Sequence, residues 1–349
     1  MSIYHNEKNH FNYKFESYNI FTNFLKLINK FNISIDSPNH YRYQSLISFL
    51  LEKKFSYDII HASLLYFLVQ SVDNDFDKSK IKYIINNNFN SQVLFFLCQF
   101  IKFNSIVKSN IFFNKQKINK ICIFFKQKIY ILLSEIVFFI KNLENISEID
   151  FAYEKNSFVK LSFFYIFIGN IIKEFTLVEK IENKLLNIIN PLSKVLIDKF
   201  LTNNRKKHLF LLTSIIENLY FITKENKINA DFTYRVKSNL SIWCKMVRKK
   251  TGIDKIKDIL GIRIITFTEK NCYFLLNTIV NEYKKLLCYF KDFIKKPKQN
   301  GYSAIHILIK KGQHYIEIQI RTKKMDEFCQ NGKAAHWIYK KDKIKLEKL

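Results

Sequence analysis

The stretch that decides the fold is Ile259-Leu-Gly-Ile-Arg-Ile-Ile-Thr-Phe267, an almost unbroken run of β-branched and apolar residues. Such a run is typical of a strand that is buried on both faces of a sheet. Residues His314–Ile320 alternate instead, with every isoleucine on one face, and Ala304–Lys310 is a third β-rich run. Helical patterns separate these runs, at Leu240–Lys250, Asn271–Leu287 and Lys324–Ala335. The second part of the chain is therefore predicted to hold a mixed sheet with helices.

The first part of the chain has a different pattern, because its apolar residues recur at steps of three and four between polar Asn, Lys and Ser stretches. With only 6 Gly and 3 Pro in 349 residues, it fits a helix bundle better than a sheet with tight turns. The predicted helical runs are Leu46–Leu51, Ile59–Val72, Val93–Ile101, Ile121–Leu143 and Phe158–Ile172, with one more amphipathic helix at Lys207–Phe221. The expected fold class is α+β, with an all-helical domain at 1–199 and a mixed-sheet domain at 200–349.

The net charge of +27 is concentrated toward the end of the chain. From Asp231 onward there are 27 Lys and Arg against 11 Asp and Glu. The abundance of Ile, Asn and Lys is also what A/T-rich codons produce, which weakens any inference from charge alone. A concentrated positive field suits a polyanionic partner, either nucleoside triphosphates or nucleic acid.

Membrane and secretory signals are absent from the sequence. The longest apolar stretches, Ile59–Val72 and Leu161–Ile172, fall short of the ~20 residues that a membrane span needs. No signal peptide is visible at Met1, and no spacing among the six cysteines suits zinc. We expect a cytoplasmic protein with reduced thiols and no membrane attachment.

Two carboxylates are candidates for chemistry at the strands. Asp258 comes directly before the first β-rich run, where a strand end can fix a Mg²⁺ ligand. Glu317 lies in the alternating strand, on the face opposite its isoleucine neighbours. If the two strands are neighbours, the two acids could share a metal, and one could accept a proton from an attacking hydroxyl. Taken singly, each is more simply a surface acid.

A cationic cluster precedes these acids in the pattern Arg-x-Lys-x₃-Ser-x₃-Lys, formed by Arg235, Lys237, Ser241 and Lys245. Ser241 and Lys245 are four residues apart and share a helix face, where a hydroxyl and an ammonium can grip a polyphosphate. The simpler interpretation is a solvated basic face in a lysine-rich protein.

A second cationic segment, Lys291–His306, contains Pro297 and Gly301, which are scarce residues here and indicate a loop of defined shape. Its lysines could hold phosphates, and Tyr302 offers a ring on which a base could stack, although core packing is the simpler role for that ring.

The joint order of these motifs is far more specific than any one of them. After the cationic cluster and Asp258-x₄-Arg263 come Lys298-x-Asn-Gly-Tyr-x-x-Ile-His306, then Glu317-Ile-Gln-Ile-Arg-Thr322, then Ala334-Ala-His-Trp337. Over Tyr234–Lys341 the chain resembles the RelA/SpoT synthetases of (p)ppGpp. The resemblance implies a nucleotidyltransferase-like mixed sheet and Mg²⁺-dependent transfer of pyrophosphate from ATP to the 3′-hydroxyl of GDP or GTP, as in the stringent response.

The resemblance also implies a role for each matching residue. Two arginines would sandwich the adenine of ATP, Arg235 and Arg263. Three residues would grip its phosphates, Lys237, Ser241 and Lys245. Asp258 would bind Mg²⁺, and Glu317 would activate the 3′-hydroxyl and also touch the metal. Tyr302 would stack on guanine, and four further residues would contact the acceptor nucleotide, Lys291, Lys298, Asn300 and His306.

The chain departs from the family pattern at a few positions. Tyr234 stands where the family has Gly before Arg-x-Lys, and Ser303 and Ala304 replace the usual Gln and Ser after Gly-Tyr. None of these changes removes a reacting group. The family's ribosome-binding C-terminal regions do not follow Trp337, so ribosome binding is not expected, and an oligomer is possible.

Long members of the family carry a helical, metal-dependent hydrolase domain before the synthetase. Its His-Asp pair would fall on Tyr66 and Phe67, and the Glu-Asp a turn later on Gln70 and Ser71. A further ligand stretch is approached by Leu133–Asn142, again with aromatic residues in place of ligands. Aromatic rings are poor partners for Mn²⁺. The expected domain is thus a degenerate hydrolase-like bundle with its activity lost, the alternative being an unrelated helical bundle.

For the whole protein the competing interpretation is a binding module. It would be an inactive synthetase fold that binds nucleotide or RNA with the same cationic surface. The retained pair Asp258 and Glu317 favours the enzyme, because an RNA-binding surface has no use for acids inside a cationic groove.

Overall fold

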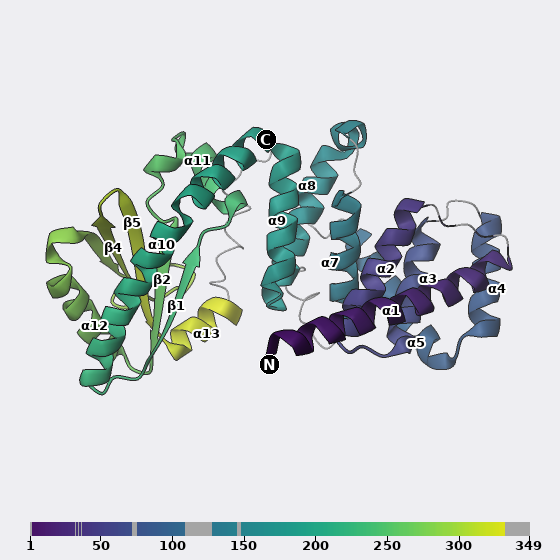
Figure 1. The fold of residues 1–349 in the computed structure, drawn as a ribbon, viewed down its shortest axis with the longest axis horizontal. Helices are drawn as coiled ribbons and strands as arrows, with labels where there is room; N and C mark the ends of the chain where they lie inside the picture. Colours follow the sequence, from purple (N-terminus) through teal and green to yellow (C-terminus); the bar gives the residue numbers. More distant parts are fainter. Residues whose placement is uncertain are drawn as a thin grey trace. The chain divides into compact units, whose positions relative to one another are not determined.

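The computed structural model describes residues 2–31, 33, 35, 37–71, 75–108, 128–144 and 148–331. It divides into two compact units, Met1–Ile181 and Glu182–Leu349. The first unit is helical and the second contains a five-stranded mixed sheet, so the predicted fold class is confirmed (Figure 1). In the parts of the chain described here, no helix has the length and apolar character to cross a membrane.

The helices of the first unit include every predicted helical run that lies within the described residues. They are α1 (Ser2–Asn29), α2 (Ser37–Glu52), α3 (Tyr57–Ser71), α4 (Asp75–Asn88), α5 (Ser91–Lys108), α7 (Ile129–Glu144), α8 (Glu148–Ile171) and the start of α9 (Phe175–Ile189). Helix α3 lies at the centre, because its apolar side chains on nearly all sides are buried. Val72, the last residue of one predicted run, and the beginning of the run predicted from Ile121 lie outside the described residues.

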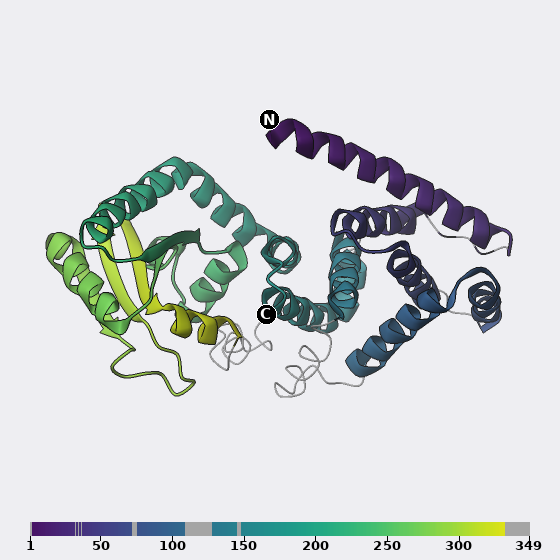
Figure 2. The same ribbon diagram turned by 90° about the horizontal axis from the view of Figure 1, so that it is seen from below.

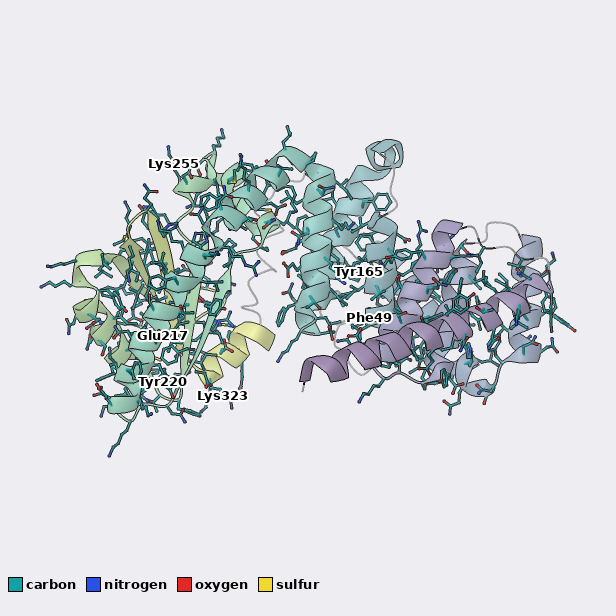
Figure 3. The ribbon with its side chains drawn as sticks, in the orientation of Figure 1. Phe49, Tyr165, Glu217, Tyr220, Lys255 and Lys323 are labelled. Atoms are coloured by element: carbon teal, nitrogen blue, oxygen red, sulfur yellow. The ribbon has the colours of Figure 1, made fainter. Side chains whose placement is uncertain are left out.

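Aromatic rings fill the place where the sequence suggested a degenerate metal site. Phe67 stacks on Phe138 with ring centroids 3.8 Å apart. The hydroxyl of Tyr66 donates to Glu135 Oε1 at 2.7 Å, and that of Tyr165 (labelled in Figure 3) donates to Glu135 Oε2 at 3.0 Å. Burial, and then the Glu135 charge, raise the pKa of both tyrosines, so each stays a protonated donor at neutral pH. These two bonds satisfy a carboxylate that lies within the helical core.

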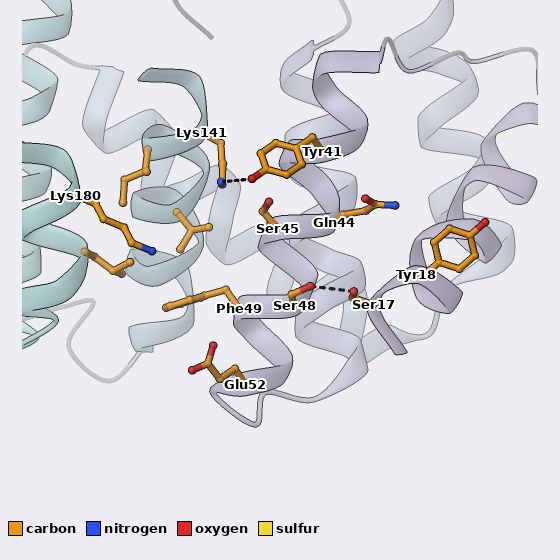
Figure 4. A pocket seen from close by; sticks show the side chains of 13 residues that line it. Ser17, Tyr18, Tyr41, Gln44, Ser45, Ser48, Phe49, Glu52, Lys141 and Lys180 are labelled. Carbon is orange, nitrogen blue, oxygen red and sulfur yellow. Dashed lines mark hydrogen bonds between the residues drawn. The ribbon is translucent and has the colours of Figure 1, made fainter. Parts of the chain in front are cut away.

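A pocket of about 550 Å³ opens between α1, α2, α7 and α9 of the first unit (Figure 4). Ser48 of α2 donates to Ser17 of α1 at 2.9 Å, and Lys141 of α7 lies 3.2 Å from the hydroxyl of Tyr41. Apolar side chains of α7 and α9 form part of its wall.

The sheet of the second unit has the strand order β1-β2-β5-β4-β3. Its strands are β1 (Ala230–Val236), β2 (Leu260–Thr266), β3 (Leu287–Asp292), β4 (Ile305–Lys311) and β5 (His314–Thr322). The central pair β2 and β5 is parallel, and the other three pairs are antiparallel. The helices are α10 (Pro191–Glu225), α11 (Asn239–Lys249), α12 (Glu269–Glu282) and α13 (Lys323–Asn331).

Two helices cover one face of this sheet (Figures 1 and 2). The isoleucines of β2, β4 and β5 on that face are buried, and α10 and α12 pack against them. Helix α10 runs for 35 residues and begins with a defined cap, in which the Asn190 side chain accepts from Ser193 N and Pro191 takes the first position. The two compact units divide between Ile181 and Glu182, within α9, and α10 lies wholly in the second unit, while the domain boundary at 199/200 stays a prediction.

Three sequence predictions about the sheet need correction. Strands β1 and β3 were not predicted, and the helix expected to reach Leu287 ends at Glu282, so that Leu287 instead begins β3. Strand β2 is not buried on both faces: its residues alternate between buried and half-buried, because one face of the sheet carries no covering layer like α10 and α12. That open face carries the polar side chains.

A histidine pair joins α10 to the sheet. His208 is only 3% exposed, and its Nε2 lies 3.3 Å from His314 Nδ1 on β5. Burial, and then the positive charges of His314 and Lys207, lower the pKa of His208 to about 4 from the usual 6.5. The folded chain therefore holds this imidazole in its neutral form.

Acid is expected to destabilise the protein through this pair. Below pH 6.5 the unfolded chain binds a proton that folded His208 does not accept until about pH 4, so the free energy of unfolding falls as the pH drops through that window. His208→Gln should remove about 2 kcal/mol of that decrease, measured by urea unfolding at pH 7 and pH 4.5. Equal losses in wild type and variant would contradict this assignment.

Candidate active site

Strand register brings five of the twelve predicted site residues to the open face of the sheet, Arg235, Arg263, Lys291, His306 and Glu317. Glu317 pairs with Gly261, which in turn pairs with Arg235. Gln319 pairs with both Arg263 and His306. Directly paired residues share a face, so these side chains lie together, and Lys291 joins them because it pairs with His306.

Glu317 is held from both of its oxygens. His306 Nδ1 lies 3.2 Å from Oε1, and Gln319 Nε2 donates to Oε2 at 2.8 Å. The other ring nitrogen of His306, Nε2, lies 2.7 Å from the hydroxyl of Tyr302. A continuous chain of hydrogen bonds thus runs from Tyr302 through His306 and Glu317 to Gln319.

These contacts keep Glu317 ionised. Burial raises its pKa, but the hydrogen bond and charge of His306 and the bond from Gln319 outweigh burial and lower the pKa to about 2. Tyr302 responds in the opposite way, because burial raises the pKa of its hydroxyl to about 12. At neutral pH the site therefore holds a carboxylate acceptor and a protonated phenol.

Asp258 lies in the turn before β2, and one of its carboxylate oxygens, Oδ2, contacts the ammonium groups of two lysines. Lys237 Nζ is 2.7 Å from Asp258 Oδ2, and Lys245 of α11 contacts the same atom. Burial raises the pKa of Asp258, but the two ammonium groups outweigh burial and lower it strongly. Burial also lowers the pKa of Lys237, to about 8. The predicted phosphate-binding lysines thus contact the predicted metal ligand.

The two acids are close enough to affect one another. The charge of Asp258 raises the pKa of Glu317, opposing the stronger effect of His306. Tyr289 of β3 senses both charges, since burial first and then Glu317 and Asp258 raise its pKa. The charge of one carboxylate therefore acts on the other, and a metal shared between them stays a prediction.

The loop between β3 and β4 places Tyr302 through a tight turn. Gly301 has a φ of +79°, a conformation that favours glycine, and a Cβ there would lie 3.0 Å from the Phe328 ring. Asn300 Oδ1 accepts from Tyr302 N at 3.3 Å, and Lys298 Nζ lies 4.9 Å from the centroid of the Tyr302 ring. Asn300, Lys298 and Tyr302 thus form one local structure.

The two predicted adenine-binding arginines come from adjacent strands. Arg235 is exposed, and its side chain passes over Gly261, where a Cβ would lie 3.6 Å from Arg235 Cγ. Arg263 Nη1 lies 3.8 Å from Asp326 of α13. The side chain of Asp326 also forms a buried ion pair with Arg321, with Nη2 2.5 Å from Oδ1. Arg263 thus sits at the edge of a buried charge cluster.

Sequence reasoning assigned no role to Gln319, Arg321 or Asp326. The first two lie in the strand motif of Glu317 at alternating positions, so their place on its face could have been deduced. The place of Asp326 could not have been deduced, because its contact with Arg321 depends on how α13 packs against β2 and β5. The predicted phosphate residue Ser241 is buried and accepts a hydrogen bond from Ser238 at 2.8 Å. The motif Ala334-Ala-His-Trp337 lies outside the described residues.

Within the described ranges, no three His, Cys, Asp or Glu side chains are grouped so that they could hold one metal ion. Asp258 and Glu317 still fit Mg²⁺ by their chemistry. Both are ionised and offer oxygen, and Mg²⁺ commonly takes one or two carboxylates and fills its remaining positions with water and substrate phosphates.

A match to a protein-family model lies within the second unit. Residues 234–344 match the family model described as a region found in RelA / SpoT proteins. A probable chloroplastic GTP diphosphokinase of Arabidopsis thaliana is 39% identical over 137 residues, which are 39% of this chain and 19% of that protein. A guanosine-3′,5′-bis(diphosphate) 3′-pyrophosphohydrolase of Spiroplasma citri is 37% identical over 164 residues, which are 46% of this chain and 22% of that protein.

A solved structure is also similar, the small alarmone synthetase 2 from Bacillus subtilis, with 30% identity and a TM-score of 0.34. The alignment covers 40% of this chain and 80% of that one. The chain spans only about a fifth of the length of the curated relatives it matches.

Proposed function

Because residues 234–344 belong to the RelA/SpoT family, we propose that the second unit transfers pyrophosphate from ATP to the 3′-hydroxyl of GDP or GTP and so makes (p)ppGpp. The observation that carries this proposal is that Glu317 and Asp258 are both ionised, that the Asp258 charge acts on the pKa of Glu317, and that Lys237 and Lys245 contact Asp258. An acid pair within a cationic site suits a reaction that needs both a proton acceptor and neutralisation of phosphate charge.

In the proposed reaction, the 3′-oxygen of the acceptor attacks the β-phosphorus of ATP. At the same time the bond breaks between this phosphorus and the oxygen that bridges it to the α-phosphorus. AMP leaves with that oxygen. Glu317 takes the proton of the 3′-hydroxyl, and His306 and Gln319 hold its carboxylate in one orientation for that transfer. Because the carboxylate is fully ionised at neutral pH, no prior deprotonation is needed.

Cations around the acids would hold the donor phosphates. Lys237, Ser241 and Lys245 are assigned to the ATP phosphates, and Arg235 and Arg263 to the adenine. These residues lie on β1, β2 and α11 or directly beside them, so one side of the site would bind ATP. Ser241 would have to exchange its bond from Ser238 for a phosphate contact.

The acceptor nucleotide is assigned to the other side of the site. Tyr302 would stack on guanine, while Lys291, Lys298, Asn300 and His306 would contact its phosphates and ribose. The support is that these residues lie on β3, on β4 and in the loop between them, and that one of them, His306 of β4, contacts Glu317 directly. This arrangement would put the acceptor hydroxyl and the carboxylate side by side.

We assign Mg²⁺ to Asp258 and Glu317. When bound, the ion would neutralise the donor phosphates and polarise them toward attack. The support is the pair of ionised oxygen ligands, which the chemistry of Mg²⁺ favours.

The activity test uses the purified chain with ATP, Mg²⁺ and labelled GDP or GTP. We expect a guanine nucleotide with a 3′-pyrophosphate, separated by anion-exchange chromatography, and no product when Mg²⁺ is removed with EDTA. The alternative is an inactive module that binds nucleotide or RNA with the same surface. Tight RNA binding without any product would favour that module and contradict the enzyme.

We also propose that the helical region at 1–199, which includes the first unit, is a hydrolase-like bundle without hydrolase activity, although relatives named as known or probable pyrophosphohydrolases are among those that the chain matches. The support is the exchange of expected ligands for Tyr66 and Phe67, whose rings pack in the core. With Mn²⁺ added, no release of pyrophosphate from ppGpp is expected, measured by the same chromatography. Mn²⁺-dependent release above that of a heat-denatured sample would refute the loss of the site.

ATP and GDP or GTP are the proposed partners, and the proposed location is the cytoplasm. Nucleotide substrates and reduced thiols are both typical of that compartment.

A further inference from the structure

Asp258 lies in a compact charge cluster whose geometry is set by backbone structure. Lys237 follows β1 directly, and its N–H donates to the Ile259 carbonyl at 2.8 Å, which extends the β1–β2 pairing by one bond. That bond places the Lys237 side chain beside Asp258. Lys245 reaches the same carboxylate from α11, one turn after Ser241. Two separate elements thus direct ammonium groups to a single oxygen, Asp258 Oδ2.

The cluster is also poorly accessible to solvent. The exposed fractions of the side chains are 10% for Lys237, 23% for Lys245 and 16% for Asp258. Ion pairs in such surroundings are weakly screened, and separating one partner without a replacement is costly. A divalent cation that approaches Asp258 would meet two positive charges already in contact with its ligand oxygen.

We propose that Lys237 and Lys245 occupy Asp258 in the nucleotide-free protein, so that a divalent cation binds there only when a polyphosphate draws the lysines away. This inference rests on the proposed function, in which the same lysines hold ATP phosphates. Polyphosphate and metal binding at this site are then coupled.

Charge balance explains why the exchange is favourable. When the lysines turn to a triphosphate, their charges stay paired, but Asp258 loses two positive neighbours. A divalent cation restores those two charges at the carboxylate and also binds the phosphates. Each ligand therefore lowers the cost of binding the other, and by linkage the effect is reciprocal.

The test measures Mn²⁺ binding to nucleotide-free full-length chain, using the electron paramagnetic resonance signal of free Mn²⁺. Wild type should bind Mn²⁺ weakly at this site. Lys237→Met and Lys245→Met, made separately so that one lysine still pairs with Asp258, should each bind it about 5- to 150-fold more tightly, the usual range of coupling between sites. Asp258→Asn added to either variant should abolish the gain.

A matched control is Lys249→Met, which removes the same charge from an exposed position on α11. It should leave Mn²⁺ affinity at the wild-type value. The inference is overturned if both lysine variants bind no more tightly than wild type, or if their gain equals that of Lys249→Met or persists with Asp258→Asn. Circular dichroism checks that each variant is folded. Because no nucleotide turns over in this titration, its outcome is separate from that of the synthesis assay.

Discussion

Replacing Glu317 with glutamine is expected to slow pyrophosphoryl transfer by on the order of 10³-fold, the size of a lost general base. The amide keeps the shape of the side chain and can still bond to Gln319, but it cannot take the proton of the 3′-hydroxyl. The rate is measured as product formed from ATP and GDP. Binding of GDP and of a non-hydrolysable ATP analogue, measured by calorimetry, should change only a few-fold.

The control for this variant is Glu225→Gln, which makes the same chemical change at an exposed position at the end of α10. It should retain the wild-type rate. If Glu317→Gln keeps more than a tenth of the wild-type rate, Glu317 is not the proton acceptor, and the assignment of the carboxylate fails.

The second large effect concerns stability. Asp326→Asn should lower the free energy of unfolding by about 3 kcal/mol, because it leaves the buried guanidinium of Arg321 without its counter-charge. For a unit of this size, that loss corresponds to roughly 6–12 °C in Tm. It also removes the carboxylate that lies 3.8 Å from Arg263 Nη1 and helps to orient this arginine, so the affinity for the ATP analogue should fall. Thermal unfolding and calorimetry check the two effects.

A double variant separates the lost charge from lost packing. Arg321→Met combined with Asp326→Leu removes both charges and keeps similar volumes, so it should recover much of the stability that Asp326→Asn loses. A double variant as unstable as the sum of its two single variants would show that the ion pair is not the cause.

Much of the sheet was predictable because hydrophobic period and burial agree there. In β5 the isoleucines alternate with Glu317 and Gln319, and the structure buries one set and opens the other. Strand β2 was predicted, but the prediction that both of its faces are buried is wrong. The β-branched residues around Arg263 are equally apolar on both faces, so the sequence does not indicate which face the helices cover. Which face a helix covers is decided by tertiary packing.

The missed strands have separate physical reasons. Strand β3 follows α12 after a short 3₁₀ turn at Lys284–Leu286, without Gly or Pro, so the apolar pattern of the helix continues unbroken into Leu287. Strand β1 is an edge strand and mostly exposed, so it lacks the clear alternation of a half-buried strand.

The candidate site was predictable as a set of residues but not as a set of contacts. Motif order indicated Asp258, Lys237 and Lys245 as parts of one site. It could not show that the lysines bind the acid, because they come from different elements whose distance only the fold sets. The same holds for Glu317 and His306, which are paired through the register of β4 and β5.

The most direct test of the central claim is a ³¹P NMR time course of the purified chain with ATP, GDP and Mg²⁺. Transfer of pyrophosphate predicts that AMP and a guanosine carrying a 3′-diphosphate appear in equal amounts while ATP and GDP decline, and that the Glu317→Gln protein leaves the spectrum unchanged. Formation of ADP in place of AMP, or a wild-type spectrum that never changes, would contradict it.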